Sequence, residues 1–223
     1  MAKTGKLTAV VAVRKGSQRV KNKNIRPFGN TNLLELKLAS LKKIEQIDEI
    51  IVNSDCDKML SIARKYGVTS QKRQDYYASS ECTNSEFHGH IAEVTDSEYI
   101  FLSPVCSPFV SEKSHKDSIR LFMESDCDSL TSVTEVKNHL WLNGSPINYN
   151  LENVPNSQDL PDIVKLNYGI TLIDREFMKN KRRVVGNSPM FYKLNDLESI
   201  DIDDEFDFEL AELFYRKKVL REI

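Results

Sequence analysis

The chain has 223 residues, of which 40% are hydrophobic and 29% are charged, which is the balance of an ordinary soluble protein. A net charge of -2 excludes a protein that binds polyanions over its whole surface. No apolar run approaches the ~20 residues of a membrane span, and the four cysteines lack metal-binding spacing, so we expect a cytoplasmic protein with reduced thiols and no membrane contact.

Strand and helix patterns alternate along the first 136 residues. Continuous β-branched runs are typical of buried parallel strands, and apolar residues three and four apart are typical of helices. In chain order we expect a strand at 7–13, a helix at 32–44, a strand at 49–54, helices at 56–67 and 86–94, a strand at 98–103, a helix at 111–124 and a strand at 128–136. Asn84 or Ser85 is the expected N-cap of the third helix, and Ser111 that of the fourth.

The regular alternation stops at residues 138–166. This stretch contains three prolines, many asparagines and the only tryptophan, Trp141. A segment this long and irregular is usually functional or a subunit-contact arm. A strand at 168–174 and a helix at 203–223 complete the pattern, and this helix begins with acidic and ends with basic residues, as the helix dipole favours.

This order predicts a single α/β domain over residues 1–223, with three α/β/α layers around a mostly parallel sheet. Ligands of such sheets bind outside the carboxyl ends of the strands. The loop after the first strand leaves at that end. It holds six basic residues and no acidic one, namely Arg14, Lys15, Arg19, Lys21, Lys23 and Arg26. We therefore expect a local positive charge at the ligand crevice.

The basic loop fits three interpretations: a solvated surface loop, a nucleic-acid contact, or a cradle for a nucleoside triphosphate. Gly16 and Ser17 favour the triphosphate, because small residues let the backbone approach phosphate oxygens. The loop matches neither the Walker A pattern nor the dinucleotide-binding pattern. Nucleic acid is the weakest interpretation, since no aromatic residues are interleaved with the basic ones.

Six segments in collinear order resemble the acylneuraminate cytidylyltransferases, the CMP-sugar-acid synthetases. The first, "VAVRKGSQRVKNKNIRPFGN", resembles their A-R-x-x-S-K-G-x-x-x-K-N signature, and its matching residues are Arg14, Ser17, Lys23 and Asn24. The others are "DEIIVNSDCDKMLSIARKYGV", "KRQDYYASSECTNS", "FLSPVCSPF", "KLNYGITLID" and "SIDIDDEFDF". Together the segments cover nearly the whole chain.

The resemblance implies a Rossmann-like nucleotidyltransferase sheet and CMP transfer from CTP to a hydroxyl of an acidic sugar, with release of pyrophosphate. The nucleotide-binding residues it implies are Arg14, Gly16, Ser17, Lys23, Asn24, Arg73, Asn84 and Ser85. Arg73 would lie near the cytosine; the alternative is a surface arginine after a short strand. The family resemblance also implies a homodimer in which residues 138–166 complete the partner's acceptor site.

The implied catalytic residues are Arg14, Lys23, Asp201 and Asp203. Asp201 and Asp203 stand two apart, so in extended chain both side chains point to one face. Paired carboxylates suit Mg²⁺, and the resemblance implies that this pair holds the catalytic metal. The alternative is that Asp203 or Asp204 only caps the last helix.

The sequence departs from the family pattern at the acceptor site. The positions implied to contact the acceptor are Ser103, Trp141, Lys165 and Asn167. Ser103 stands in place of a glutamine, and Lys165 in place of an arginine, which keeps the charge but loses the bidentate grip on a carboxylate. We expect a small acidic acceptor, such as a nonulosonic or octulosonic acid. The alternatives are a small phosphonate acceptor, or a CTP-binding protein without turnover.

Overall fold

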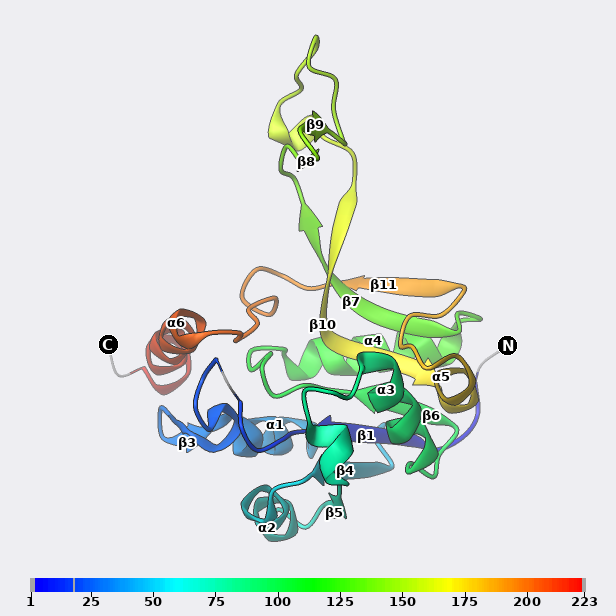
Figure 1. The fold of residues 1–223 in the computed structure, drawn as a ribbon, viewed down its shortest axis with the longest axis vertical. Helices are drawn as coiled ribbons and strands as arrows, with labels where there is room; N and C mark the ends of the chain where they lie inside the picture. Colours follow the sequence, from blue (N-terminus) through cyan, green and yellow to red (C-terminus); the bar gives the residue numbers. More distant parts are fainter. Residues whose placement is uncertain (1–2, 18, 222–223) are drawn as a thin grey trace.

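A seven-stranded sheet in the order β11-β7-β10-β6-β1-β4-β5 forms the centre of the computed structural model, which describes residues 3–17 and 19–221 (Figure 1). Its strands are β1 (Leu7–Ala12), β4 (Glu49–Ser54), β5 (Thr69–Lys72), β6 (Tyr99–Leu102), β7 (Ser129–Val136), β10 (Ile163–Asp174) and β11 (Pro189–Lys193). Only β10 runs against its neighbours in this sheet, pairing antiparallel with both β6 and β7. The expected mostly parallel sheet is confirmed.

Helices cover both faces of the sheet. They are α1 (Leu33–Leu41), α2 (Asp57–Lys65), α3 (Asn84–Glu93), α4 (Glu112–Glu124), α5 (Arg175–Lys181) and α6 (Glu205–Tyr215). Strand β1 shows the division, because successive side chains of a strand point to opposite faces. Ala9 and Val11 belong to the core built with α1, α2, α4 and α6, whereas Val10 packs with α3 and α5. The three-layer α/β/α architecture is thus confirmed.

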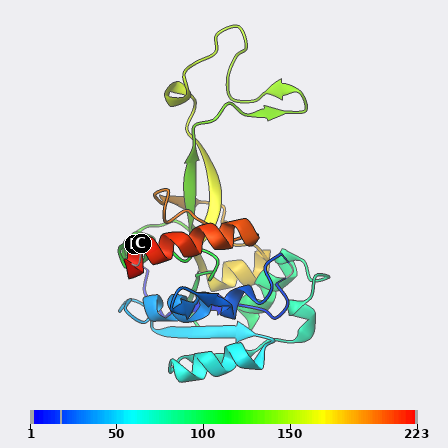
Figure 2. The same ribbon diagram turned by 90° about the vertical axis from the view of Figure 1, so that its left-hand side faces the viewer.

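The last helix returns to the segment that follows β1. Figure 2 shows α6 lying over this part of the chain. Phe28, in the short strand β2 (Pro27–Phe28), packs against Phe208 and Tyr215 of α6, with ring centroids 5.5 and 5.1 Å apart. The Gly29 amide donates to Glu212 at 3.0 Å. This packing brings the residues just before α6 next to the basic loop.

The expected N-cap of α3 is wrong. Thr83, not Asn84 or Ser85, accepts the hydrogen bond from the Glu86 amide, and the Glu86 side chain bonds back to Thr83 in a capping box. Asn84 and Ser85 are instead the first two helical residues and are exposed. Ser111 caps α4 as expected, by accepting from the Ser114 amide.

Residues 137–162 form an arm that projects away from the sheet between β7 and β10 (Figures 1 and 2). The arm contains the short hairpin of β8 (Trp141–Leu142) and β9 (Ser145–Pro146). The expected irregular segment ends earlier than residue 166, because Ile163 and the three residues after it pair with β7. No helix in the described part of the chain is long and apolar enough to cross a membrane.

Candidate active site

A pocket of about 260 Å³ lies where β1 and β6 end, at the edge of the sheet that was expected to bind a ligand. Its lining residues are Ala12, Val13, Arg14, Ser17, Arg19, Val20, Lys23, Asn24, Pro104, Val105, Cys106 and Asp203. Five residues that the sequence predicted for the site meet here: Arg14, Ser17, Lys23, Asn24 and Asp203. We refer to this cavity as the phosphate pocket. Gln18 lies outside the described residues.

Hydrogen bonds fix the basic loop around the phosphate pocket. Asn24 is buried, and its Nδ2 donates to the Arg14 carbonyl oxygen at 3.1 Å, so its side chain closes the loop upon itself. Lys23 Nζ donates to the carbonyl oxygen of Ile202, which joins the loop to the segment before α6. Gly16 has a φ of 82°, a conformation that favours glycine, and the position of a Cβ there is open.

Arg14, which lines this pocket, lies near Arg73. Arg14 Nη1 donates to the carbonyl oxygens of Ala78 and Ser79 at 2.9 and 3.1 Å. Arg73 is only 3% exposed, binds the side chain and the carbonyl oxygen of Asn53, and lies over the Phe87 ring at 5.0 Å. The alternative of a surface arginine is therefore wrong.

The environment of Arg73 lowers its pKa to about 10. Burial is the main cause, and the Arg14 cation acts in the same direction, whereas Asp55 acts against both. The guanidinium is still charged at neutral pH. A buried cation with fixed Nε and Nη2 is a rigid hydrogen-bond donor, which is compatible with the predicted role near a nucleobase.

The two predicted metal ligands have different surroundings. Asp203 is exposed and forms an ion pair with Arg19 at 2.7 Å. Asp201 has its Oδ1 shielded from solvent without a hydrogen-bond partner among the described residues. A buried carboxylate oxygen that lacks a donor is costly, and a hard cation would satisfy it. The donor chemistry of this carboxylate therefore suits Mg²⁺, but of the two aspartates only Asp203 lines the phosphate pocket, and Asp201 also lies within hydrogen-bonding reach of the Cys106 thiol. No described cluster of three or more His, Cys, Asp or Glu side chains forms a complete cage.

Asp204, rather than Asp203, caps the last helix. It accepts from the Asp207 amide at 3.0 Å, and the Asp207 side chain accepts from the Asp204 amide at 3.1 Å. Asp203 is thus not required as the N-cap. Cys106 lies beside Asp201, and its pKa is raised to about 12 by burial first and then by the Asp201 carboxylate, so the thiol is neutral and is no nucleophile at physiological pH.

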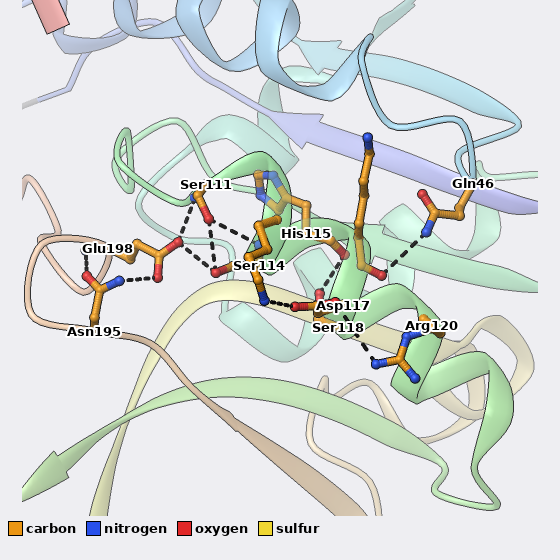
Figure 3. Close-up of polar contacts among 11 residues, drawn as sticks. Gln46, Ser111, Ser114, His115, Asp117, Ser118, Arg120, Asn195 and Glu198 are labelled. Carbon is orange, nitrogen blue, oxygen red and sulfur yellow. Dashed lines mark hydrogen bonds and ion pairs between the residues drawn. The ribbon is translucent and has the colours of Figure 1, made fainter.

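Glu198 anchors the segment that carries both aspartates. Its carboxylate accepts from the Ser111 amide at 2.9 Å, from Ser114 Oγ at 2.6 Å and from Asn195 Nδ2 at 2.7 Å (Figure 3). Burial acts to raise the pKa of Glu198, but these hydrogen bonds outweigh it and the pKa is lowered. The carboxylate also lies at the positive end of α4. No sequence motif identified this residue.

Lys37 plays the corresponding role for the loop after β6. It is 2% exposed, and its Nζ donates to the Ser107 carbonyl oxygen at 2.9 Å. Burial lowers its pKa to about 8. The sequence carried a signal that could have revealed it, because Lys37 occupies the apolar face of α1 together with Leu34, Leu38 and Leu41.

A second cavity, which we name the apolar pocket, also has a volume of about 260 Å³ and shares Ala12 and Pro104 with the phosphate pocket. Its lining residues are Val10, Ala12, Asn84, His88, Leu102, Ser103, Pro104, Tyr168, Thr171 and Val184. Two predicted residues, Ser103 and Asn84, lie here, whereas Ser85 lines neither pocket. No Lys, Arg, Asp or Glu is among its lining residues.

Comparison with protein families decides between the interpretations of the basic loop. A family model described as "Cytidylyltransferase" matches residues 8–222. The chain belongs to the cytidylyltransferase family. The triphosphate interpretation is therefore the one that fits, and the nucleic-acid interpretation is set aside.

Individual proteins similar to this cytidylyltransferase are distant in sequence. It is 20% identical to the post-translational flagellin modification protein B of Campylobacter coli, over 96% of this chain and 97% of that protein. It is 24% identical to an N-acylneuraminate cytidylyltransferase of Escherichia coli, over 96% of this chain, and it spans about half the length of that relative (53%). A solved CMP:2-keto-3-deoxy-manno-octonic acid synthetase complexed with CTP has the same fold, with a TM-score of 0.72, 9% identity and coverage of 96% and 100%.

The predicted acceptor residues of the cytidylyltransferase do not gather in one place. Trp141 lies on the arm with 53% of its surface exposed. Lys165 is exposed in the part of β10 next to the arm. Asn167 is bound internally, because its Oδ1 accepts from Ser132 Oγ and its Nδ2 donates to Thr134 Oγ1 at 2.9 Å. Of these four residues, Ser103 alone lines one of the two described pockets.

Proposed function

We propose that this cytidylyltransferase transfers CMP from CTP to a hydroxyl of a sugar acid and releases pyrophosphate. The convergence of Arg14, Ser17, Lys23 and Asp203 on one pocket at the carboxyl ends of β1 and β6 carries the proposal. The names of the Escherichia coli relative and of the octonic acid synthetase support a sugar acid as the acceptor.

The phosphate pocket has the groups that this reaction needs. The acceptor hydroxyl oxygen attacks the α-phosphorus and gives its proton to solvent, the bond to the bridging oxygen breaks, and pyrophosphate leaves with the negative charge. Positioning and charge neutralisation supply most of the catalysis in phosphoryl transfer. Lys23, which is fixed to the Ile202 carbonyl oxygen, and Arg14, which is fixed to the carbonyl oxygens of residues 78 and 79, would neutralise the triphosphate without large rearrangement.

Asp201 and Asp203 would hold Mg²⁺, as the unpartnered Oδ1 of Asp201 suggests. When bound, the ion would neutralise phosphate charge and orient the reacting oxygens. Arg19, which pairs with Asp203 in this structure, would be released toward the triphosphate when the carboxylate binds a cation.

A homodimer is part of the proposal. The arm exposes several large apolar side chains, namely Trp141, Leu142, Ile147, Leu151 and Val154, each more than half exposed. Exposed apolar groups concentrated on one projection are typical of an interaction surface. A second copy of the chain would cover them and bring its arm near the acceptor site. Sedimentation of the protein at twice the mass of one chain would support this assembly, and a monomer at micromolar concentration would contradict it.

The test of the reaction compares two lysines of the same loop. Lys23 lines the phosphate pocket, whereas Lys21 is exposed and does not. We expect Lys23→Ala to lower kcat/KM for CTP by about 100-fold, as the loss of a charge-stabilising donor typically does. Lys21→Ala should change it by less than about threefold, the size of a small screened surface charge effect. Equal effects of the two substitutions would refute the triphosphate role of the pocket.

A further inference from the structure

A short 3-10 helix, η2 (Asp75–Ala78), carries backbone oxygens that hold Arg14. Arg14 Nη1 donates to the carbonyl oxygens of Ala78, the last residue of η2, and of Ser79, its C-cap. No residue of η2 is buried, and its N-cap, Gln74, makes no capping hydrogen bond with its side chain. A single 3-10 turn has poor hydrogen-bond geometry and few buried contacts, so it opens easily on its own. The position of Arg14 therefore depends on contacts that hold η2 from outside.

Two tyrosines of η2 make these contacts, and both reach helix α3. The ring of Tyr77 stacks on the imidazole of His90, with centroids 3.7 Å apart and ring planes 9° from parallel. Tyr76 donates its hydroxyl to Glu86 at 2.9 Å, and the two tyrosine rings meet edge to face at 5.3 Å. Aromatic pairs in such arrangements add stability beyond the area they bury. Helix α3 is thus the platform on which η2 rests.

His90 is held firmly in that platform. It is 7% exposed, and the next two residues of α3, Ile91 and Ala92, are fully buried in the core. Burial and then the Arg73 cation lower the pKa of His90, whereas Glu93 acts against both, so the imidazole is neutral at pH 7. Its Nε2 has no hydrogen-bond partner among the described residues. The contact that His90 makes with η2 is therefore the stack of its ring face on Tyr77.

We propose that His90 is a positioning residue for CTP binding, which acts through its stack on Tyr77. The stack fixes the carbonyl oxygens at the end of η2, and these fix Arg14 in the phosphate pocket. Both hydrogen bonds of the Arg14 guanidinium within the described chain use Nη1, so Nε and Nη2 remain to bind the triphosphate. An arginine that is already held loses less side-chain freedom when the ligand binds, which raises the affinity.

His90 acts on the nucleotide only at a distance, because it lines neither the phosphate pocket nor the apolar pocket. This inference rests on the proposed binding of CTP. It goes beyond the proposed function in assigning part of the CTP affinity to a residue of α3 outside both pockets.

The variants His90→Ala and His90→Phe separate the stack from other roles of the residue. Alanine removes the ring and is the best helix former, so α3 is expected to persist. Phenylalanine keeps an aromatic face, and a cavity of about 120 Å³ beside His90 gives it room. Val94→Ala is the matched control, because Val94 is the C-cap of the same helix, is 36% exposed and lines neither pocket.

Isothermal titration with CTP in the absence of acceptor measures the affinity without relying on turnover. We expect His90→Ala to raise the Kd for CTP by about fivefold, the size of one aromatic pair, and His90→Phe and Val94→Ala to stay within about twofold of the wild type. The KM for the acceptor, measured by pyrophosphate release, should stay within about twofold in all three variants, because the stack does not touch the acceptor.

A double-mutant cycle with Arg14→Ala tests the route through Arg14. His90→Ala should lower kcat/KM for CTP by about fivefold in the wild-type background and leave it unchanged in the Arg14→Ala background. Additive effects would overturn the proposal. So would an unchanged Kd for CTP in His90→Ala, or binding by His90→Phe as weak as that by His90→Ala.

Failure of this inference is distinguishable from failure of the proposed function. In each of the outcomes that overturn the role of His90 alone, the wild type still binds CTP. Tight CTP binding by the wild type without turnover would count against the transfer reaction, and the Kd values of the variants would still decide the role of His90. A wild type that does not bind CTP would overturn the proposed function and this inference with it.

Discussion

Replacing the buried Lys37 with methionine is expected to stabilise the protein and impair the site. Lys37 lies in α1 with 2% of its surface exposed, and its Nζ has a single 2.9 Å hydrogen bond to the Ser107 carbonyl oxygen. Burial lowers its pKa from 10.5 to about 8. At pH 7 the lysine is still mainly charged, so the fold holds a cation in a largely apolar environment.

The magnitude follows from the pKa shift. At about 1.4 kcal/mol per pKa unit, the fall from 10.5 to about 8 corresponds to about 3 kcal/mol of destabilisation at pH 7. Loss of the hydrogen bond to Ser107 costs about 1 kcal/mol. Methionine is unbranched and adapts to irregular spaces, so we expect Lys37→Met to raise the free energy of unfolding by about 2 kcal/mol at pH 7.

The pH dependence has a definite sign. Between pH 8 and 10.5, the unfolded chain binds more protons at this lysine than the folded protein does. This group therefore makes the wild type more stable as the pH rises. The variant lacks this contribution. Its advantage should be largest below pH 8 and should reverse above pH 10.5, where only the lost hydrogen bond remains.

Urea unfolding of wild type and Lys37→Met at pH 7 and pH 10 measures both effects. Lys58→Met is the control, since Lys58 is exposed on α2 and the same substitution there removes no buried charge. We also expect kcat/KM to fall by about tenfold in Lys37→Met, because the loop holding Pro104 and Cys106 loses its anchor. A variant that is less stable than the wild type at pH 7, or a stability difference independent of pH, would refute the reasoning.

Three further substitutions test the site. Asp203→Asn should lower Mg²⁺-dependent pyrophosphate release by at least about 100-fold. The thermal unfolding temperature should stay near that of the wild type, because Asp204 and not Asp203 caps α6. Undiminished turnover would remove the metal assignment. Arg73→Lys should raise the KM for CTP by about tenfold, since lysine lacks the fork that binds Asn53; an unchanged KM would place the base elsewhere. Glu198→Gln should make the free energy of unfolding fall less steeply below pH 5. The lowered pKa of Glu198 means that its carboxylate stabilises the fold above its unfolded pKa and that this stabilisation is lost as the pH falls through the folded pKa. Identical acid unfolding curves for the variant and the wild type would contradict the anchoring role.

The sequence allowed the prediction of the elements whose pattern is local. Strand β1 has a continuous apolar run, and α4 has both an apolar face and Ser111 as its cap, so both were predicted within two residues. Strand β11 and helix α5 were not predicted, because Phe191 on β11 is exposed and α5 has only seven residues. The reversed direction of β10 could not be read from its residues, since direction depends on the path of the arm.

The phosphate pocket was predictable because most of its residues come from one loop. Arg14, Ser17 and Lys23 are close in sequence, and a local motif places them. The apolar pocket was not predictable, because its walls come from β1, α3, β6 and β10, and no motif contains them together. Glu198 was not predictable for the same reason, because its partners Ser111 and Ser114 are 87 and 84 residues away in the chain.

The most direct test of the central claim is product analysis after incubation of the protein with CTP, Mg²⁺ and a panel of acceptors. The panel would contain N-acylated nonulosonic acids, an octulosonic acid and small phosphonates, with ATP, GTP and UTP run in place of CTP. The account predicts pyrophosphate release only with CTP, matched one to one by a CMP-sugar-acid ester identified by mass. Pyrophosphate release with another nucleotide, a phosphonate as the preferred acceptor, or CTP binding without any product would contradict it.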